Sequence, residues 1–258
     1  MSLAHLDGFI LDLDGTCYLG ERVIPGAPEF VARCRALGKR VLWLTNNCSR
    51  SAAYYAEKLT RLGFAASPAD VFTSGEATIR VLRGEGVTRV YLLGTPSLEE
   101  EFCTGGICLT AEDPQRVVAA FDLGVTYEKL RNACRLIRLG VPFVATHPDL
   151  NCPTEEGPIP DCGAICAFIT ASTGVQPRVV GKPNPAMANA AARRLGLPPE
   201  RIGVVGDRLY TDLRMAVENG MTGILVLSGE TTRAHLETSS VRPHYVAENL
   251  GCLVEALL

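Results

Sequence analysis

The sequence predicts an α/β protein with a doubly wound parallel sheet into which a smaller α/β unit is inserted. In the first and last thirds of the chain, short apolar segments alternate with amphipathic helical segments. This alternation is typical of parallel strands covered by helices on both faces. The middle of the chain repeats it with strands and helices of its own. We therefore expect a core domain at 1–78 and 179–258 and a cap domain at 79–178.

In the first third, apolar spacing separates strands from helices. Residues 8–13 (GFILDL) and 41–45 (VLWLT) are short and almost wholly apolar, as buried strands are. Between them, residues 27–38 place apolar side chains at helical spacing and end in a glycine. The other segments assigned here are a hairpin at 18–23, a helix at 50–62 and a strand at 70–75.

The spacing of apolar residues also distinguishes strands from helices in the rest of the chain. In the middle we expect strands at 89–94, 117–124 and 142–146 and helices at 127–140 and 163–173. In the last third we expect strands at 178–182, 201–207 and 223–229 and helices at 184–196 and 209–219.

Charge and hydropathy exclude some functions. The net charge of −3, the pI of about 5.9 and the absence of a Lys/Arg block argue against nucleic-acid binding. No apolar run is long enough to span a membrane. The N-terminal residues lack the pattern of a signal peptide, so we expect a cytoplasmic protein.

The ten cysteines show no metal-site spacing, because no C-x-x-C occurs. We expect them to pack as free thiols, like small apolar residues.

Polar residues end four of the strands that we assign to the core. These residues are Asp12 and Asp14 after the first, Thr45, Asn46 and Asn47 after the second, Lys182 after the third, and Asp207 with Asp212 after the fourth. In an open α/β sheet, ligands bind outside the carboxyl ends of the strands. The sequence therefore predicts one site at this edge.

The residue types at this edge point to phosphate chemistry with a metal. Carboxylates without histidine or cysteine partners suit a hard cation, so we expect Mg²⁺. Lys182 and Thr45, with neighbouring backbone N–H groups, suit a phosphoryl group. Two acids serve two tasks: Asp12 attacks phosphorus, and Asp14 protonates the departing oxygen and then activates water.

Four short motifs resemble those of the haloacid dehalogenase superfamily. They are DLDGT at 12–16, LTNN at 44–47, GKPNP at 181–185 and GDRLYTD at 206–212, in the order of that superfamily. The insert between the second and third motifs resembles its C2-capped branch. Residues 145–174 are similar to the cap of the NagD and p-nitrophenylphosphatase family.

The resemblance implies a role for each matching residue. Asp12 is expected to be the nucleophile and a Mg²⁺ ligand, and Asp14 the acid/base that binds Mg²⁺ through its backbone carbonyl. Thr45 and the amide of Asn46 hold phosphoryl oxygens, and Lys182 bridges phosphate and nucleophile. Asp207 is the third metal ligand, with Asp212 an outer carboxylate. Because superfamily members that are dehalogenases lack the second acid, a phosphatase is favoured.

Substrate choice is assigned to the cap loop at 146–152. We expect the polar residues at the sheet edge to bind the phosphoryl group and the metal. Another element must therefore recognise the remaining part of a small phosphorylated metabolite. His147, Asp149 and Asn151 offer polar groups there, and we predict that Asn151 contacts substrate. The alternative is that Asp149 and Asn151 only shape the turn. The family handles nucleoside monophosphates, sugar phosphates and related esters, and its caps often pair in homodimers.

Two other functions use similar residues. A receiver-type signalling module also has an acceptor aspartate, a threonine, a lysine and Mg²⁺, but it has no acid at the position of Asp14 and no inserted cap. A phosphomutase would share the covalent intermediate. Continuous phosphate release separates a phosphatase from both.

Overall fold

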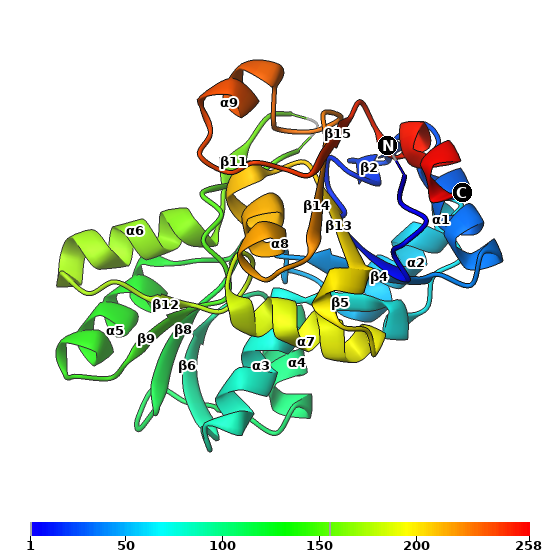
Figure 1. Ribbon diagram of the computed structural model, residues 1–258. Coiled ribbons are helices and arrows are strands. Elements are labelled where there is room, and N and C mark those ends of the chain that lie inside the picture. Colours follow the sequence, from blue (N-terminus) through cyan, green and yellow to red (C-terminus); the bar gives the residue numbers. More distant parts are fainter. Residues whose placement is uncertain (1, 155) are drawn as a thin grey trace.

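The computed structural model describes residues 2–154 and 156–258 and contains two parallel β-sheets, each flanked by helices (Figure 1). The larger sheet has six strands in the order β15-β14-β13-β1-β4-β5. Their bounds are β1 Gly8–Leu11, β4 Arg40–Thr45, β5 Val71–Thr73, β13 Ile202–Gly206, β14 Thr222–Val226 and β15 Tyr245–Ala247. All of its pairings are parallel, which confirms the predicted fold class.

The smaller sheet has five strands in the order β12-β9-β8-β6-β7, also all parallel. Their bounds are β6 Arg89–Leu93, β7 Cys108–Leu109, β8 Arg116–Ala119, β9 Phe143–Ala145 and β12 Arg178–Val179. Two short antiparallel hairpins complete the strands: β2 Tyr18–Leu19 with β3 Arg22–Val23, and β10 Asn151–Cys152 with β11 Ile159–Pro160.

Nine α-helices are present in the described residues. They are α1 Ala27–Ala36, α2 Ala52–Arg61, α3 Ser74–Gly84, α4 Pro96–Thr104, α5 Tyr127–Arg138, α6 Cys162–Thr173, α7 Pro185–Leu195, α8 Arg214–Glu218 and α9 Arg233–Thr238. A π-helical turn, Leu209–Leu213, precedes α8, and short 3₁₀ turns lie at Pro68–Asp70, Pro199–Arg201, Leu250–Leu253 and Glu255–Leu257.

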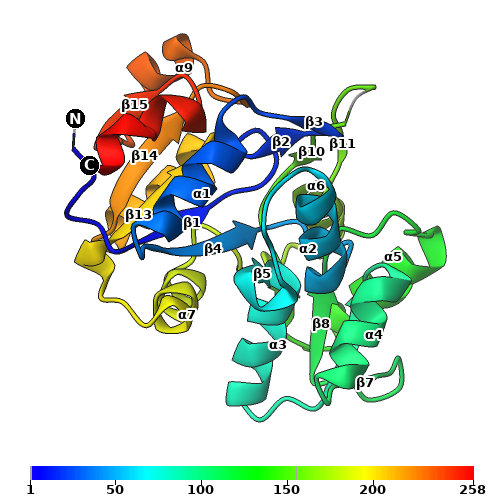
Figure 2. The same ribbon diagram turned by 90° about the vertical axis from the view of Figure 1, so that its right-hand side faces the viewer.

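Alternating side chains bury both faces of the large sheet. In β4, Trp43 packs into a cluster with Phe30 of α1, whereas Leu42 and Leu44 pack into a cluster with Met187 of α7. The two clusters lie on opposite faces because successive side chains of a strand point to opposite sides. Figure 2 shows α1 and α7 on either side of the strands. The sheet is therefore doubly wound, as predicted.

Side-chain caps fix where several helices begin. Ser51 accepts a hydrogen bond from Tyr54 N at 3.3 Å at the start of α2, and Asn184 accepts one from Ala186 N at 2.9 Å at the start of α7. Such caps satisfy backbone donors that the first turn leaves unpaired. Because α7 starts at Pro185, directly after this cap, Lys182 lies in the loop before the helix.

One predicted strand is assigned to the wrong sheet. The segment 178–182 was expected to be a core strand, but β12 covers only Arg178–Val179 and pairs with β9 of the five-stranded sheet. The apolar residues of this segment suit a strand of either sheet, so its sequence does not show which sheet it joins. Only the long-range pairing of β12 with β9 decides this. Helices α3, α4 and α9 and strands β7, β10, β11 and β15 were not predicted. The domain boundaries at 78/79 and 178/179 stay predictions; they fall inside α3 and β12.

All ten cysteines are free, and six of them are buried. No helix in the described part of the chain has both the length and the apolar character to cross a membrane.

Candidate active site

Three adjacent strands bring polar side chains to one edge of the large sheet. Asp12 follows β1, Thr45 ends β4 and Asp207 follows β13, with β1 between the other two strands. The N–H of Asp12 donates to Val205 O at 2.9 Å, so the strand pairing extends to this acid. Asp12 and Thr45 line the same pocket, and Asp12 shares a carboxylate cluster with Asp207. The strand ends therefore meet as their order requires.

Lys182 reaches this edge from the segment that links the small sheet to α7. The N–H groups of Val180 and Gly181 extend the β12 pairing to Ala145 O and Thr146 O, at 3.0 and 2.7 Å. The N–H of Lys182 then donates to Asn46 Oδ1 at 2.9 Å. The structure thus brings Lys182 to the predicted edge, but from a strand that belongs to the small sheet and not to the large one.

Lys182 joins two buried acids. Its Nζ donates to Asp12 Oδ1 at 2.5 Å and to Asp212 Oδ1 at 2.6 Å. Burial alone would lower the pKa of Lys182, but the charges of Asp12 and Asp212 raise it above its ordinary value. Lys182 is therefore a fixed positive charge at this edge.

One lysine does not balance three neighbouring carboxylates. Oxygen atoms of Asp12, Asp207 and Asp212 lie within 4.8 Å of one another. Burial raises the pKa of Asp12; Lys182 opposes this rise, and Asp212 and Asp207 add to it. Burial and then the charge of Asp212 raise the pKa of Asp207 to about 7. The cluster therefore carries excess negative charge that a cation would stabilise.

The donor set fits a hard divalent cation. Asp207 Oδ1 is buried without a hydrogen-bond partner, while its Oδ2 accepts from Glu230 N at 2.6 Å. Oxygen-only ligands suit Mg²⁺ or Ca²⁺. Asp12, Asp207 and Asp212 would hold such an ion. The carboxylate of Asp14 is not part of this cluster, so its predicted metal contact remains a prediction about its backbone carbonyl.

Asp14 lies where two cavities meet. It lines both the pocket around Asp12 and a larger adjoining cavity. Burial raises the pKa of Asp14, against the opposing charges of Lys58 and Arg208. A raised pKa suits a carboxyl group that must donate a proton near neutral pH.

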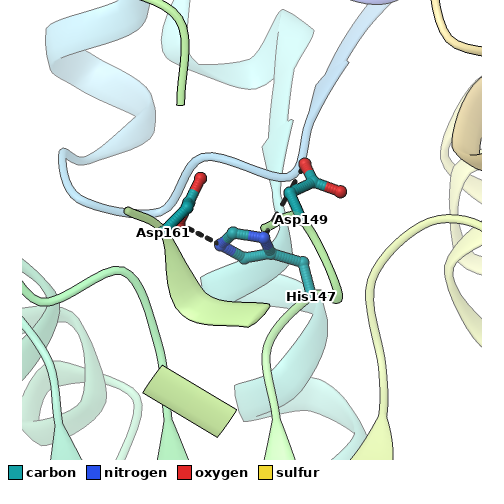
Figure 3. A group of neighbouring side chains, drawn as sticks. All are labelled: His147, Asp149 and Asp161. Carbon is teal, nitrogen blue, oxygen red and sulfur yellow. Dashed lines mark ion pairs between the residues drawn. The ribbon is translucent and has the colours of Figure 1, made fainter. Parts of the chain in front are cut away.

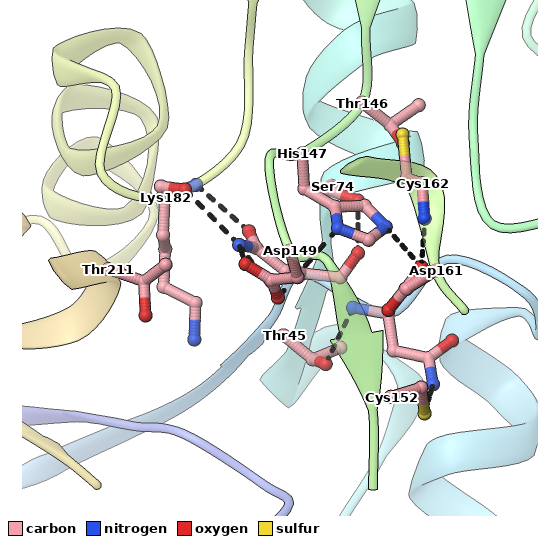
Figure 4. A network of polar contacts seen from close by, with 12 residues as sticks. Thr45, Ser74, Thr146, His147, Asp149, Cys152, Asp161, Cys162, Lys182 and Thr211 are labelled. Atoms are coloured by element: carbon pink, nitrogen blue, oxygen red, sulfur yellow. Dashed lines mark hydrogen bonds and ion pairs between the residues drawn. The ribbon is translucent and has the colours of Figure 1, made fainter. Parts of the chain in front are cut away.

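The end of β4 and the loop after it supply three of the predicted substrate residues. Thr45, Asn46 and Asn47 all line the pocket around Asp12. Thr45 Oγ1 accepts from Asn47 N at 3.0 Å. The Asn46 side chain accepts from Lys182 N and donates to Asp149 Oδ1 at 3.2 Å, so it ties three loops together. Figure 4 shows Thr45, Asp149 and Lys182 meeting from separate parts of the chain.

Asp149, in the loop that follows β9, is held by residues that follow two strands of the large sheet. Besides Asn46, it accepts a hydrogen bond from Arg208 Nη1 at 2.9 Å. Arg208 Nε also pairs with Glu230 Oε2 at 2.9 Å. Arg208 therefore bridges an acid of the cap loop and an acid of the loop after β14.

His147 lies behind the pocket and not in it. The ring is fully buried, with Nδ1 3.8 Å from Asp149 Oδ2 and Nε2 3.4 Å from Asp161 Oδ1 (Figure 3). Burial lowers the pKa of His147. His147 does not line the pocket around Asp12 or the larger cavity beside it. Both ring nitrogens are buried without a hydrogen-bond partner in the structure, and His147 faces neither of the two cavities beside Asp12.

Asn151 is exposed at the start of β10 and lines the larger cavity, outside the pocket around Asp12. Five residues that line the pocket around Asp12 were not predicted as site residues: Cys152, Pro153, Asp161, Arg208 and Thr211. Arg208 could have been found, because it directly follows Asp207 at a strand end. Cys152 and Asp161 carry no such signal.

Close approaches explain two glycines of the motifs. A Cβ on Gly15, whose φ is +82°, would lie 2.4 Å from Asp207 Oδ2. A Cβ on Gly206 would lie 2.4 Å from the Asp212 side chain. Only glycine lets the two backbones approach these carboxylates so closely.

Comparison with known proteins gives consistent matches along the whole chain. Residues 9–108 match the family model described as haloacid dehalogenase-like hydrolase, and residues 179–253 match a second one described as HAD-hydrolase-like. A protein of Bacillus subtilis named 5'-nucleotidase YutF is 34% identical over 94% of this chain and 95% of its own. An acid sugar phosphatase of Staphylococcus saprophyticus is 35% identical over 99% of both chains.

Comparison with solved structures also finds phosphatases. The 4-nitrophenylphosphatase of Thermotoga maritima is 44% identical, covers 99% of both chains and superposes with a TM-score of 0.95. A glycerol phosphate phosphatase of Mycobacterium tuberculosis in complex with magnesium is 33% identical, with a TM-score of 0.91, over 100% of this chain and 78% of its own. The same enzyme has been solved with calcium.

Proposed function

The chain belongs to the haloacid dehalogenase-like hydrolases, and from this premise we propose that it is a Mg²⁺-dependent phosphomonoesterase that forms an aspartyl phosphate on Asp12. Its relatives are phosphatases, and it is a phosphatase of small phosphorylated substrates. The metal dependence, the covalent intermediate and the residue roles below are the proposed part.

The observation that carries this proposal is the set of groups around Asp12. Its carboxylate lies 2.5 Å from the Lys182 ammonium and within 4.8 Å of ligand oxygens of Asp207 and Asp212. Asp14 follows two residues later and faces the adjoining cavity. This arrangement supplies a nucleophile, a positive charge and a separate acid.

The proposed reaction has two steps. An Asp12 carboxylate oxygen attacks phosphorus, the bond from phosphorus to the leaving oxygen breaks, and Asp14 gives that oxygen a proton. Asp14 then takes a proton from a water whose oxygen attacks the same phosphorus, which frees the Asp12 carboxylate and releases inorganic phosphate. Lys182 stabilises the negative charge on Asp12 and on the phosphoryl oxygens throughout.

Mg²⁺ held by Asp12, Asp207 and Asp212, together with the backbone carbonyl of Asp14, would supply positive charge to a phosphoryl group that these carboxylates alone repel. Thr45 and the backbone of Asn46 are the proposed contacts for phosphoryl oxygens. Residues 79–178 are proposed to act as a cap that covers the site.

The proposal is tested by following phosphate release and the phosphoenzyme together. With Mg²⁺, the wild type should release phosphate from 4-nitrophenyl phosphate for many turnovers. After acid quenching, hydroxylamine should cleave a labelled phosphoryl group from the wild type and not from Asp12→Asn. Asp12→Asn should keep the thermal stability of the wild type within a few degrees, because the substitution is nearly isosteric.

Other outcomes point elsewhere. Release of only about one equivalent of phosphate would favour a receiver-type module. An Asp12→Asn variant that keeps more than about a tenth of the wild-type kcat would exclude Asp12 as the nucleophile, because the loss would be below ~1.4 kcal/mol.

A further inference from the structure

A cavity of about 690 Å³ adjoins the pocket around Asp12. The two share Asp14, Pro153 and Arg208. An ester whose phosphoryl group lies against Asp12, with its leaving oxygen near Asp14, would place the remainder of the molecule in this cavity. Its volume lies in the range of sites for whole metabolites, not only for small fragments.

The walls of this cavity are largely apolar. Leu19, Leu150, Tyr210 and three prolines line it. Leu150 is 60% exposed and Tyr210 is 46% exposed. Large apolar side chains exposed beside a reaction site indicate a ligand that covers them. The apolar lining therefore favours a leaving group with an apolar face.

No unpaired positive charge lines the pocket or the cavity among the residues that the structure describes. Their only cationic side chains are Lys182 and Arg208. Lys182 is held by Asp12 and Asp212. Arg208 is held by Asp149 and by Glu230, each at 2.9 Å.

Glu230 adds negative charge to the wall of the cavity. Its side chain is 46% exposed and lines the cavity beside Tyr210, whose hydroxyl donates to Glu230 Oε2 at 3.3 Å. Asp149 and Glu230 together outnumber the single charge of Arg208. A carboxylate or second phosphate on the leaving group would meet this negative charge without a free cation to receive it.

We infer that the leaving group is an uncharged alcohol with an apolar face, of about the size of a nucleoside, and that Glu230, through its hold on Arg208, excludes anionic leaving groups. This inference rests on the proposed phosphatase function and names its substrate class.

The charge part is tested with glycerol 3-phosphate and 3-phosphoglycerate, which differ mainly in CH₂OH against carboxylate. The wild type should hydrolyse glycerol 3-phosphate with at least about tenfold higher kcat/KM. Glu230→Gln should reduce this ratio about tenfold, because it removes a negative charge and one of the two acids that hold Arg208. Glu218→Gln is the matched control: it removes an acid paired with Arg214, outside both cavities, and should leave the ratio unchanged.

The apolar part is tested with adenosine 5'-monophosphate and ribose 5-phosphate, which share the phosphorylated ribose carbon. The nucleotide should have at least about tenfold higher kcat/KM. Leu150→Ala should lower that advantage about fivefold or more. Leu139→Ala removes a leucine that is 70% exposed at the end of α5, away from the cavity, and should not change it.

The outcomes separate the inference from the function. Equal or better hydrolysis of 3-phosphoglycerate, or a ratio that Glu230→Gln leaves unchanged, overturns the charge assignment. An equal rate for ribose 5-phosphate, or a nucleotide advantage that Leu150→Ala leaves intact, overturns the apolar assignment. If none of the four esters nor 4-nitrophenyl phosphate is hydrolysed, the proposed function itself fails.

Discussion

Lys182 Nζ lies 2.5 Å from Asp12 Oδ1, although the two residues are 170 positions apart in the chain. Asp12 follows a strand of the large sheet, and Lys182 follows a strand of the small one. The proposed nucleophile and its positive partner are therefore held by different sheets. Their contact depends on how the two sheets are placed against each other.

Replacing Lys182 with methionine should lower kcat by about 100-fold or more, because the charge that stabilises Asp12 and the phosphoryl oxygens is lost. It should also lower the free energy of unfolding by about 3 kcal/mol, because two buried carboxylates lose their partner. Phosphate release and urea denaturation measure the two effects. Adding Asp212→Asn should restore part of the stability and none of the activity. Retention of more than a tenth of kcat would contradict the role of Lys182.

Replacing Asp14 with asparagine should separate acid catalysis from metal binding. Glycerol 3-phosphate has a poor leaving group, so its kcat/KM should fall about 100-fold more than that of 4-nitrophenyl phosphate, whose phenolate leaves with little help. Steady-state kinetics on both substrates gives the comparison. Equal losses would mean that Asp14 acts through the metal or the fold.

Metal binding should be visible in stability as well as in activity. The wild type should be inactive in EDTA and active again with Mg²⁺, and Ca²⁺ should inhibit because its larger, looser coordination shell misplaces the nucleophile. Mg²⁺ should also raise the Tm of the wild type, because it binds the folded state alone. In Asp207→Asn this rise should need at least about tenfold more Mg²⁺. Full activity after exhaustive dialysis against EDTA would contradict the metal requirement.

Local patterns predicted the fold class and most of the polar edge. Asp12, Thr45 and Asp207 were found because apolar strand residues run directly into them, and the carboxyl ends of parallel strands share an edge. The alternation of Trp43 with Leu42 and Leu44 in β4 likewise follows from strand geometry. These features depend on residues that are close together in the sequence, so the sequence alone predicts them.

Features that depend on how the sheets pack together were not readable. Segment 178–182 has the composition of a core strand, yet β12 pairs with β9. The bridge from Asp149 through Arg208 to Glu230 joins three loops that no sequence pattern links. His147 was a candidate for substrate contact, but its loop turns the ring inward to Asp161.

Asn151→Ala tests the one cap residue that the sequence singled out. Because Asn151 lines the larger cavity, we expect the ratio of kcat/KM for adenosine 5'-monophosphate to that for ribose 5-phosphate to change at least about threefold. The concentration of Mg²⁺ needed for half activity should not change. A uniform loss on both substrates together with a lower Tm would instead assign Asn151 to the shape of the turn.

Glu101 of α4 should make stability fall as the pH rises. Its Oε2 is buried and has no hydrogen-bond partner in the structure. Burial, and then the charge of Glu76, raise the pKa of Glu101 to about 7. The ordinary pKa of glutamate is about 4.3, so the folded state holds this proton more tightly than the unfolded state does. This contribution to stability is full below about pH 4 and is lost as the pH rises through about 7.

Glu101→Gln removes the titration and keeps the shape. Near pH 4, where Glu101 is largely protonated in both the folded and the unfolded state, the variant and the wild type should differ little in their free energy of unfolding. Near pH 8.5 the variant should be more stable by about 1–3 kcal/mol. Urea denaturation at both pH values measures this difference, and Glu100→Gln, an exposed neighbour on the same helix, is the control. A difference between Glu101→Gln and the wild type that is the same at both pH values would show that Glu101 keeps its ordinary pKa.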